Sequence, residues 1–215
     1  MRFVKTSSWL LLVCLMLGAM VLQPALAQEG DLETRRSQVI AQSQNQLDTA
    51  QVALEEAQDA RDRLAGRLET TGEDDPQREA IEAALEAAEA AVQQAESAFE
   101  QVKSSHSQVM DLADQAGSAA SDTEAEAALA LAEAAASNGE IFSTSLSNSL
   151  EAVIQFEAGN QAAGQELAAL AQSSMEAGQA SQASLQLGMN NLDQNNFSAA
   201  SEAADLVLAQ TQATP

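Results

Sequence analysis

The stretch from Ile81 to Ala113, IEAALEAAEAAVQQAESAFEQVKSSHSQVMDLA, carries one unbroken seam of apolar and small side chains. Steps of four and three residues alternate along it, through Ile81, Leu85, Ala88, Val92, Ala95, Phe99, Val102, His106, Val109 and Ala113. Such steps bring side chains to one face of an α-helix, and their seven-residue repeat is typical of paired helices. The stretch therefore predicts a long helix that packs along a partner.

A second seam precedes this one and supplies the partner. Its apolar and small residues also follow a seven-residue repeat, at Ile40, Ser43, Leu47, Ala50, Leu54, Ala57, Leu64 and Leu68. Arg61 interrupts the seam, but its long stem can lie along apolar surface while the charge points outward. Between the seams, Gly72 can end one helix and Asp75-Pro76 can begin the next. Because this turn is short, the two helices are expected to be antiparallel.

Folding the seams together around the turn sets small side chains against large ones. The expected pairs are Leu68 with Ile81, Leu64 with Leu85, Arg61 with Ala88, Ala57 with Val92, Leu54 with Ala95, Ala50 with Phe99, Leu47 with Val102, and Ser43 with His106. This alternation suits a closely packed seam, and a slip of register would place Ala against Ala. Residues 28–118 are therefore predicted to form a long antiparallel coiled-coil hairpin.

Two features of the predicted hairpin have both a structural and a functional interpretation. His106 can be an ordinary seam residue that hydrogen bonds to Ser43, or it can form a pH-sensitive layer, because imidazole titrates near neutrality. The acidic turn Glu73-Asp74-Asp75 can bind a divalent cation weakly, or it can be a solvated turn before a helix N-terminus. The sequence offers His106 no further metal ligands nearby, which favours its structural role.

The composition changes at Gly117-Ser-Ala-Ala-Ser-Asp122, where we place a domain boundary. Residues 119–215 are rich in Ala, Gln and Ser, and no Lys or Arg follows Lys103. Breaks at Asn138-Gly139, Gly159-Asn160, Gly178 and Asn195-Asn196 predict helices over 122–137, 140–158, 161–177, 179–193 and 197–211. We expect a bundle or a short solenoid of helical pairs, so the whole chain is predicted to be all-α.

Part of this second half resembles tetratricopeptide-like helical repeats. Residues 160–171 match residues 196–207 at five positions with an offset of 36, and Leu187-Gly188, Phe197, Ala200 and Ala204 fit the family pattern. Ser184, Asn191 and Gln212 depart from it, and the resemblance covers at most residues 140–211. It implies stacked helical pairs with a concave surface that binds peptides or proteins, without catalysis.

The segment after Met189 has the spacing of a calcium loop. Asn191, Asp193, Asn195 and Glu202 would occupy the first, third, fifth and twelfth positions, where an EF-hand places oxygen ligands. Only two of these four are charged, and Asn196 stands where the tight turn needs Gly. An ordinary turn between two helices explains the same residues. The sequence favours that turn and predicts no cofactor.

The N-terminus has the order of a secretory signal peptide. Arg2 and Lys5 precede an apolar run from Trp9 to Val21, and Leu22-Gln-Pro-Ala-Leu-Ala27 follows it. The run has 13 residues, whereas a helix needs about 20 to cross a bilayer, which argues against a retained anchor. Lipidation at Cys14 is disfavoured because Val13 is large for such processing. We expect cleavage after Ala27, export to the periplasm or beyond, and no integral membrane segment thereafter.

The chain after the predicted cleavage site is strongly acidic. Residues 28–215 contain 7 basic and 32 acidic residues, so their net charge is 7 − 32 = −25. Nucleic acids and anionic lipids would repel this chain, because both recruit proteins through Lys and Arg. A basic protein partner or weakly bound divalent cations are the natural counter-charges. The acidity can also serve only to keep an Ala-rich helical protein soluble.

The side chains that most catalytic sites require are scarce. No Cys follows Cys14, His106 is the one imidazole, and no Gly-rich phosphate loop or metal-ligand cluster occurs in the sequence. We therefore expect a protein without enzymatic activity. The leading hypothesis is an exported structural or scaffolding protein of the cell envelope, which associates with itself or with a protein partner. The alternative is a periplasmic tetratricopeptide-like adaptor or chaperone.

Overall fold

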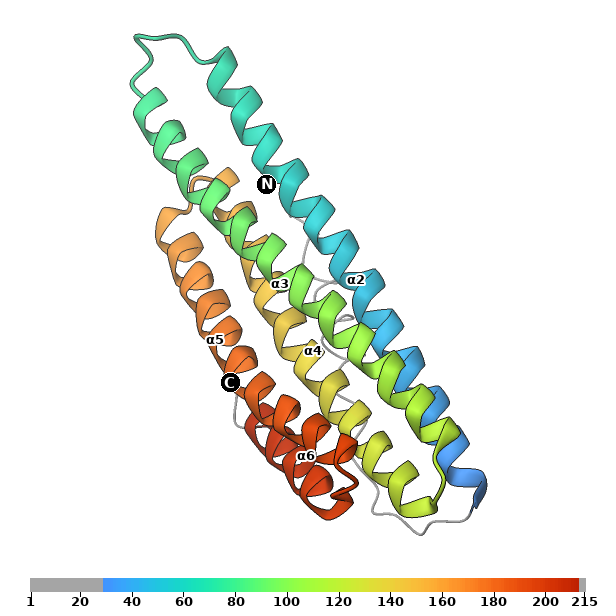
Figure 1. Cartoon of the computed structure of the whole chain (residues 1–215). Helices are drawn as coiled ribbons and strands as arrows, with labels where there is room; N and C mark the ends of the chain where they lie inside the picture. The colour runs from blue at the N-terminus through green and yellow to red at the C-terminus, as the bar shows by residue number, and fades with distance from the viewer. Residues whose placement is uncertain (1–28, 213–215) are drawn as a thin grey trace, which may run out of the picture.

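The computed structural model describes residues 29–212, which fold into five helices (Figure 1). These are α2 (Glu29–Thr70), α3 (Arg78–Ser118), α4 (Asp122–Glu157), α5 (Gln161–Asp193) and α6 (Phe197–Gln212). The predicted all-α class is confirmed, and the described residues contain no strand. The predicted signal peptide, residues 1–27, lies outside the described residues.

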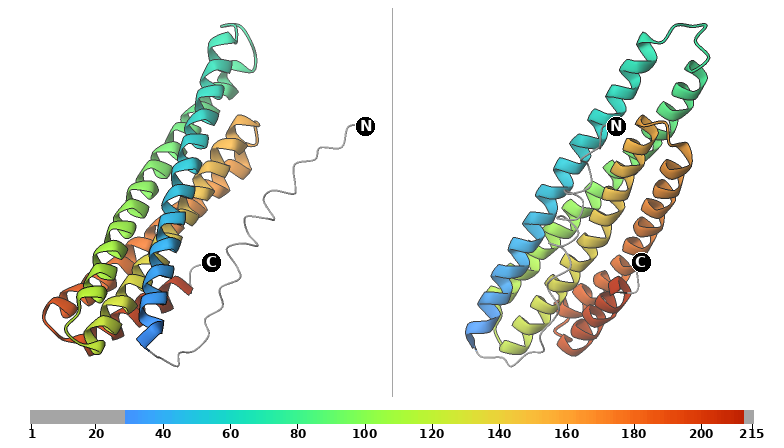
Figure 2. Two further views of the ribbon diagram at one scale, coloured as in Figure 1. Left: turned by 90° about the vertical axis from the view of Figure 1, so that its right-hand side faces the viewer. Right: turned by 180° about the vertical axis from the view of Figure 1, so that it is seen from behind.

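Helix α4 is the centre of the bundle. It packs against all four other helices: α2 and α3 on one side, and α5 and the shorter α6 on the other (Figures 1 and 2). Half of its residues are buried, among them Leu131, Phe142, Leu146, Val153 and Phe156. The molecule is elongated, and the tip of the α2–α3 hairpin extends beyond the turn that joins α4 to α5.

The register predicted for the α2–α3 hairpin is confirmed. Ser43 Oγ lies 2.9 Å from Nδ1 of His106, as expected for facing residues. Seven residues away on each helix, Arg36 Nε donates to the carbonyl oxygen of Ala113 at 2.7 Å. Because a step of seven back along α2 matches a step of seven forward along α3, both pairs belong to one antiparallel register.

Helix α3 buries a second stripe, which the seam pattern does not predict. The stripe repeats every seven residues and consists of Ala84, Ala91, Ala98, Ser105 and Leu112. Ala98 shares a buried cluster with Phe142 and Leu146 of α4. Small side chains let helix axes come close, and here they let α3 pack along α4 as well as along α2. The hairpin thus forms part of one continuous bundle.

Two of the four predicted breaks are wrong. Helix α4 continues through Asn138-Gly139 and α5 through Gly178, so the five helices expected over 122–211 are three. The Asn138 side chain does not break α4, because its Nδ2 donates to Gln182 Oε1 at 2.6 Å and its Oδ1 accepts from Ser181 Oγ. The predicted breaks at Gly159-Asn160 and Asn195-Asn196 are confirmed as turns.

Two glycines inside α5, Gly164 and Gly178, make room for aromatic rings of α4. A Cβ on Gly178 would lie 2.5 Å from the Phe142 ring, and a Cβ on Gly164 would lie 2.4 Å from the Phe156 ring. Contacts this short are not found between real atoms, so each ring occupies the space that a side chain would take. Gly178, which reads as a helix breaker in the sequence, is therefore a packing site between α4 and α5, whereas Gly139 lies against Gln46 of α2 and Ser105 of α3.

We predict that Gly178→Ala destabilises the protein. The gain in helix propensity, at most about 1 kcal/mol, is outweighed by overpacking against Phe142, so the free energy of unfolding should fall by about 1–2 kcal/mol. Gly66→Ala in α2 is the matched control, because nothing lies within 4 Å of the added methyl group. It should stabilise by about 0.5–1 kcal/mol. Urea unfolding followed by circular dichroism measures both, and a stabilising Gly178→Ala would contradict this packing.

Candidate functional site

A groove runs along the bundle between α3 and α5. These two helices flank α4 but have little contact with each other, and they leave a groove of about 660 Å³. Ser145 and Phe156 of α4 lie at its floor, and the walls come from α3 and α5. The wall residues are almost all alanines and glutamines: Ala87, Ala90, Ala91, Gln93, Gln94, Ser97 and Gln101 on α3, and Gln165, Ala168, Ala171, Gln172, Met175 and Gln179 on α5.

The glutamines form two facing rows. Gln94 and Gln101 are seven residues apart on α3, and Gln165, Gln172 and Gln179 are seven apart on α5. Gln94 Nε2 donates to Gln172 Oε1 at 3.2 Å across the groove. Because α3 and α5 run in the same direction, one step of seven along both helices places Gln101 beside Gln179. The groove is therefore lined by two rows of side-chain amides, here called the amide ladder, and among the described residues the Gln94–Gln172 hydrogen bond is the one that joins the rows.

One amide oxygen of this ladder has no partner among the described residues. Gln172 is hydrogen-bonded in turn to Glu176, since its Nε2 donates to Glu176 Oε1 at 2.8 Å. Gln94 Oε1 is buried and accepts no hydrogen bond from any residue that the structure describes. A buried acceptor without a donor costs about 1–3 kcal/mol. Gln94 Oε1 is thus an unpaired acceptor buried inside the wall of the groove and not on its open surface.

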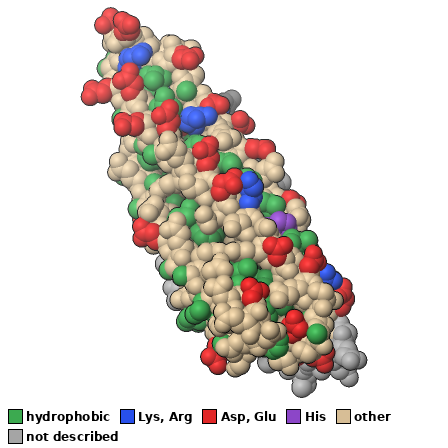
Figure 3. Space-filling view, viewed as in Figure 1, with side chains coloured by type: hydrophobic (Ala, Val, Ile, Leu, Met, Phe, Trp, Pro, Cys, Tyr) green, Lys and Arg blue, Asp and Glu red, His purple; other side chains and the backbone are tan. Residues whose placement is uncertain are grey.

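The groove carries no charge although the chain is strongly acidic. None of its lining residues is Asp, Glu, Lys or Arg. Figure 3 shows this face of the molecule: acidic side chains gather at the hairpin tip and along the α2–α3 side, whereas the surface over α5 is mainly uncharged. An uncharged, concave surface of amides and small side chains suits contact with a polypeptide, and it offers no titratable group for acid–base chemistry.

All seven basic side chains in the described residues are already engaged within the bundle. Arg35 pairs with Glu133 at 2.9 Å, and Arg63 pairs with Glu157 at 2.8 Å, so α2 is fastened to α4 at two levels. Acidic side chains or backbone carbonyls bind the other five basic side chains, which are Arg36, Arg61, Arg67, Arg78 and Lys103. Every basic side chain of the described part thus has a partner within the bundle.

Two glutamates of α4 have pKa values that are shifted in opposite directions, each for a different reason. Hydrogen bonding to the Arg63 guanidinium lowers the pKa of Glu157. Burial raises the pKa of Glu140. Neither residue lines the groove. Their pKa shifts therefore concern the stability of the bundle and its dependence on pH.

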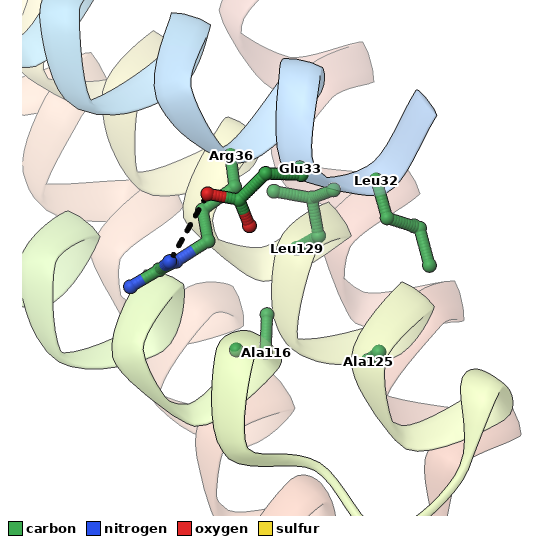
Figure 4. Close-up of a pocket in the computed structure, with 7 residues that line it drawn as sticks. Leu32, Glu33, Arg36, Ala116, Ala125 and Leu129 are labelled. Atoms are coloured by element: carbon green, nitrogen blue, oxygen red, sulfur yellow. Dashed lines mark ion pairs between the residues drawn. The ribbon is translucent and has the colours of Figure 1, made fainter. Parts of the chain in front are cut away.

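A second, much smaller pocket lies where α2 begins (Figure 4). Its volume is about 50 Å³, and Leu32, Ala116, Ala125 and Leu129 surround the side chains of Arg36 and Glu33. These two charged groups already pair at 3.5 Å, and the Arg36 guanidinium also packs over Gly117. The pocket is too small for a ligand larger than a few waters, and its charged groups hold α2 against α3.

The residues with calcium-loop spacing lie at the turn between α5 and α6. Asn195 has a φ of 59°, and Asn196 N–H donates to the Asn191 carbonyl at 2.9 Å. This is a Schellman turn, and the turn after α4 repeats it 36 residues earlier, at Gly159 and Asn160. Asp193 and Glu202 are exposed. Nowhere in residues 29–212 do three His, Cys, Asp or Glu side chains meet in a group that could hold a metal.

The remaining predicted site residues take structural positions. His106 is half-buried beside Ser43, and whether it forms a pH-sensitive layer remains a hypothesis. In the acidic turn Glu73-Asp74-Asp75, the Asp75 carboxylate accepts from the Gln77 N–H at 2.8 Å. Among the residues that carry the repeat resemblance, Gly188, Ala200 and Ala204 are buried, Phe197 is half-buried, and Leu187 is exposed.

We predict that calcium acts on this protein only as a general counter-ion. The α5–α6 turn is closed by its own backbone hydrogen bonds, so calcium and magnesium should raise the melting temperature similarly and without saturation. Differential scanning calorimetry with each cation tests this. A saturating, calcium-selective rise that Glu202→Gln abolishes, while Glu166→Gln at the equivalent place of the preceding turn does not, would contradict it.

The two perturbed glutamates predict opposite effects of pH. Arg63 lowers the pKa of Glu157, so this pair stabilises the fold above the unfolded-state value of about 4.3, and the contribution is lost as pH falls through the lowered pKa. Glu157→Gln should therefore lower the melting temperature at pH 7 but not in acid. Burial raises the pKa of Glu140, so its ionised form is unfavourable at pH 7, and Glu140→Gln should raise the melting temperature there. Variants that shift in the same direction at pH 7 would refute these assignments.

No family model, curated protein or solved structure matches this chain. None of the described helices is long and apolar enough to cross a membrane. A functional assignment therefore has to come from the geometry of the chain itself, and the α3–α5 groove is much larger than the pocket where α2 begins.

Proposed function

We propose that this chain is an exported, non-enzymatic structural or scaffolding protein of the cell envelope, and that it works by contact with polypeptide. The observation that carries the proposal is the α3–α5 groove, which is uncharged in a chain whose residues 28–215 have a net charge of −25. An elongated bundle with this uncharged groove is suited to binding other polypeptides along its length.

Export is part of the proposal because of the order of residues 1–27. A basic start, a short apolar run and an Ala-x-Ala end are the features that secretion machinery reads and then removes. The lack of Cys after Cys14 means that the exported chain needs no disulfide, which agrees with a core built from helix packing. The acidic surface would keep such a protein soluble.

The composition of the groove supports a non-catalytic role. Catalytic sites concentrate titratable side chains in a cleft, with neighbours that shift their pKa values. Here the cleft holds amides, hydroxyl groups and small apolar side chains, and the perturbed carboxyls of Glu140 and Glu157 are not among its lining residues. The amides can hydrogen bond to a bound polypeptide, and the alanines can pack against it.

A periplasmic tetratricopeptide-like adaptor or chaperone is the second candidate. The sequence resemblance within residues 140–211 is what supports it, whereas the repeated Schellman turns at Gly159 and Asn195 are separated by one long helix, α5, and not by a helical pair. In this alternative, the groove grips a segment of a client protein. Both candidates need a polypeptide in the groove, and they differ in whether that polypeptide is a permanent neighbour or a passing client.

Site-specific photo-cross-linking in cells that export the protein tests this proposal. A photoreactive amino acid in place of Gln101, in the groove, should give discrete protein adducts, whereas the same group at Gln42, on the exposed face of α2, should give few. Mass spectrometry of the same sample shows whether the chain begins at Gln28. Equal labelling at the two positions, or a chain that keeps residues 1–27, would contradict the proposal. Adducts that survive a chase identify a scaffold, and adducts that turn over identify an adaptor.

A further inference from the structure

The groove has the chemistry of a surface that pairs with itself. We propose that a second copy of this chain docks on it, so that the α3–α5 faces of two copies meet in a homodimer. This inference rests on the polypeptide-binding role proposed above and names the partner. It follows from three properties of the face: its amides, its lack of charge and its length.

The amide ladder is complementary to another amide ladder. Each glutamine side chain carries two N–H donors and one oxygen acceptor, so two rows of glutamines can satisfy each other. Gln101 and Gln179 line the groove and make no side-chain hydrogen bond among the described residues. Their amides can therefore donate to and accept from the same residues of a second copy. Rows of carboxylates could not pair in this way.

Electrostatics leaves few other faces on which two copies can meet. Each copy carries a large acidic excess, and like charges brought together at an interface repel strongly. The groove lining contains no charged residue. Glu176 on α5 is exposed and accepts a hydrogen bond from Gln172, and it does not line the groove. The α3–α5 face therefore lets the copies approach while their acidic surfaces stay apart.

The face is long enough for a weak dimer. From Ala87 to Gln101, the α3 wall of the groove extends about 21 Å, and two helices side by side are about 20 Å wide. The projected face is thus roughly 400 Å², about half of the ~800 Å² per partner of a standard interface, which suits a weak association. Because the remaining charges repel across the dimer, its dissociation constant should fall as salt rises. A basic partner in the groove would show the opposite dependence, since salt weakens attraction between opposite charges.

The first test is sedimentation equilibrium of the chain purified from cells that export it. Between about 0.1 M and about 1 M NaCl the Debye length falls from about 10 Å to about 3 Å, and the dimer fraction should rise across this range. A chain that remains monomeric throughout overturns the proposal. So does a dimer that dissociates as salt increases.

Matched variants then place the interface. Gln101→Glu with Gln179→Glu puts carboxylates into the groove at positions without internal hydrogen bonds, and it should weaken dimerisation by more than about tenfold. Gln38→Glu with Gln42→Glu makes the same charge change on exposed α2 positions and should weaken it by much less. Equal weakening by both pairs overturns the assignment to the groove. Circular dichroism checks that each variant is folded.

A charge-swap mixture keeps the test decisive if the first variant is poorly folded. Gln101→Lys with Gln179→Lys should also fail to pair with itself, but an equimolar mixture with the Glu variant should form heterodimers, because the two copies present the same face. Absence of heterodimers from two folded variants overturns the proposal. If cells yield groove adducts only to a different protein, the second copy is wrong while the polypeptide-binding function stands.

Discussion

The close approach of α3 and α5 to α4 is the constraint on which the rest of the structure depends. Small residues at the contacts make this approach possible. Gly164 and Gly178 leave space for Phe156 and Phe142, and the alanine stripe of α3 lets that helix lie near α4. With so few aromatic residues, the chain obtains its packing density from small residues set against large ones. The groove exists because α3 and α5 each pack on α4 and not on each other.

How far the sequence predicts this fold depends on how distinct each pattern is. The α2–α3 seam is readable because Leu, Ile and Val stand out against polar neighbours, and the Ser43–His106 pair confirms its register. The second stripe of α3 is hidden because alanines cover every face of that helix. Gly139 and Gly178 read as breaks, since a glycine looks the same in a sequence whether it ends a helix or packs against a neighbouring one. The partner that distinguishes these cases is distant in sequence.

The candidate groove illustrates the same limit. Gln94, Gln101, Gln172 and Gln179 are unremarkable one at a time, because glutamine is common on helix surfaces. Their seven-residue spacing on two separate helices is the signal that the sequence offers. That spacing has a meaning only once α3 and α5 are known to flank α4 on the same face of the bundle. By contrast, the motifs that looked chemical, such as Asn191, Asp193 and Asn195, belong to a turn that backbone hydrogen bonds explain.

The parallel course of α3 and α5 gives the groove a direction. The N-termini of both helices lie toward the hairpin tip, so their macrodipoles point the same way and their partial positive ends are at that end of the groove. A helix entering between them is electrostatically favoured in the opposite orientation, with its C-terminus toward the tip. A twofold axis perpendicular to the groove imposes the same antiparallel arrangement on two identical helices. Polarity and symmetry thus select one orientation of the occupant before any side chain meets another.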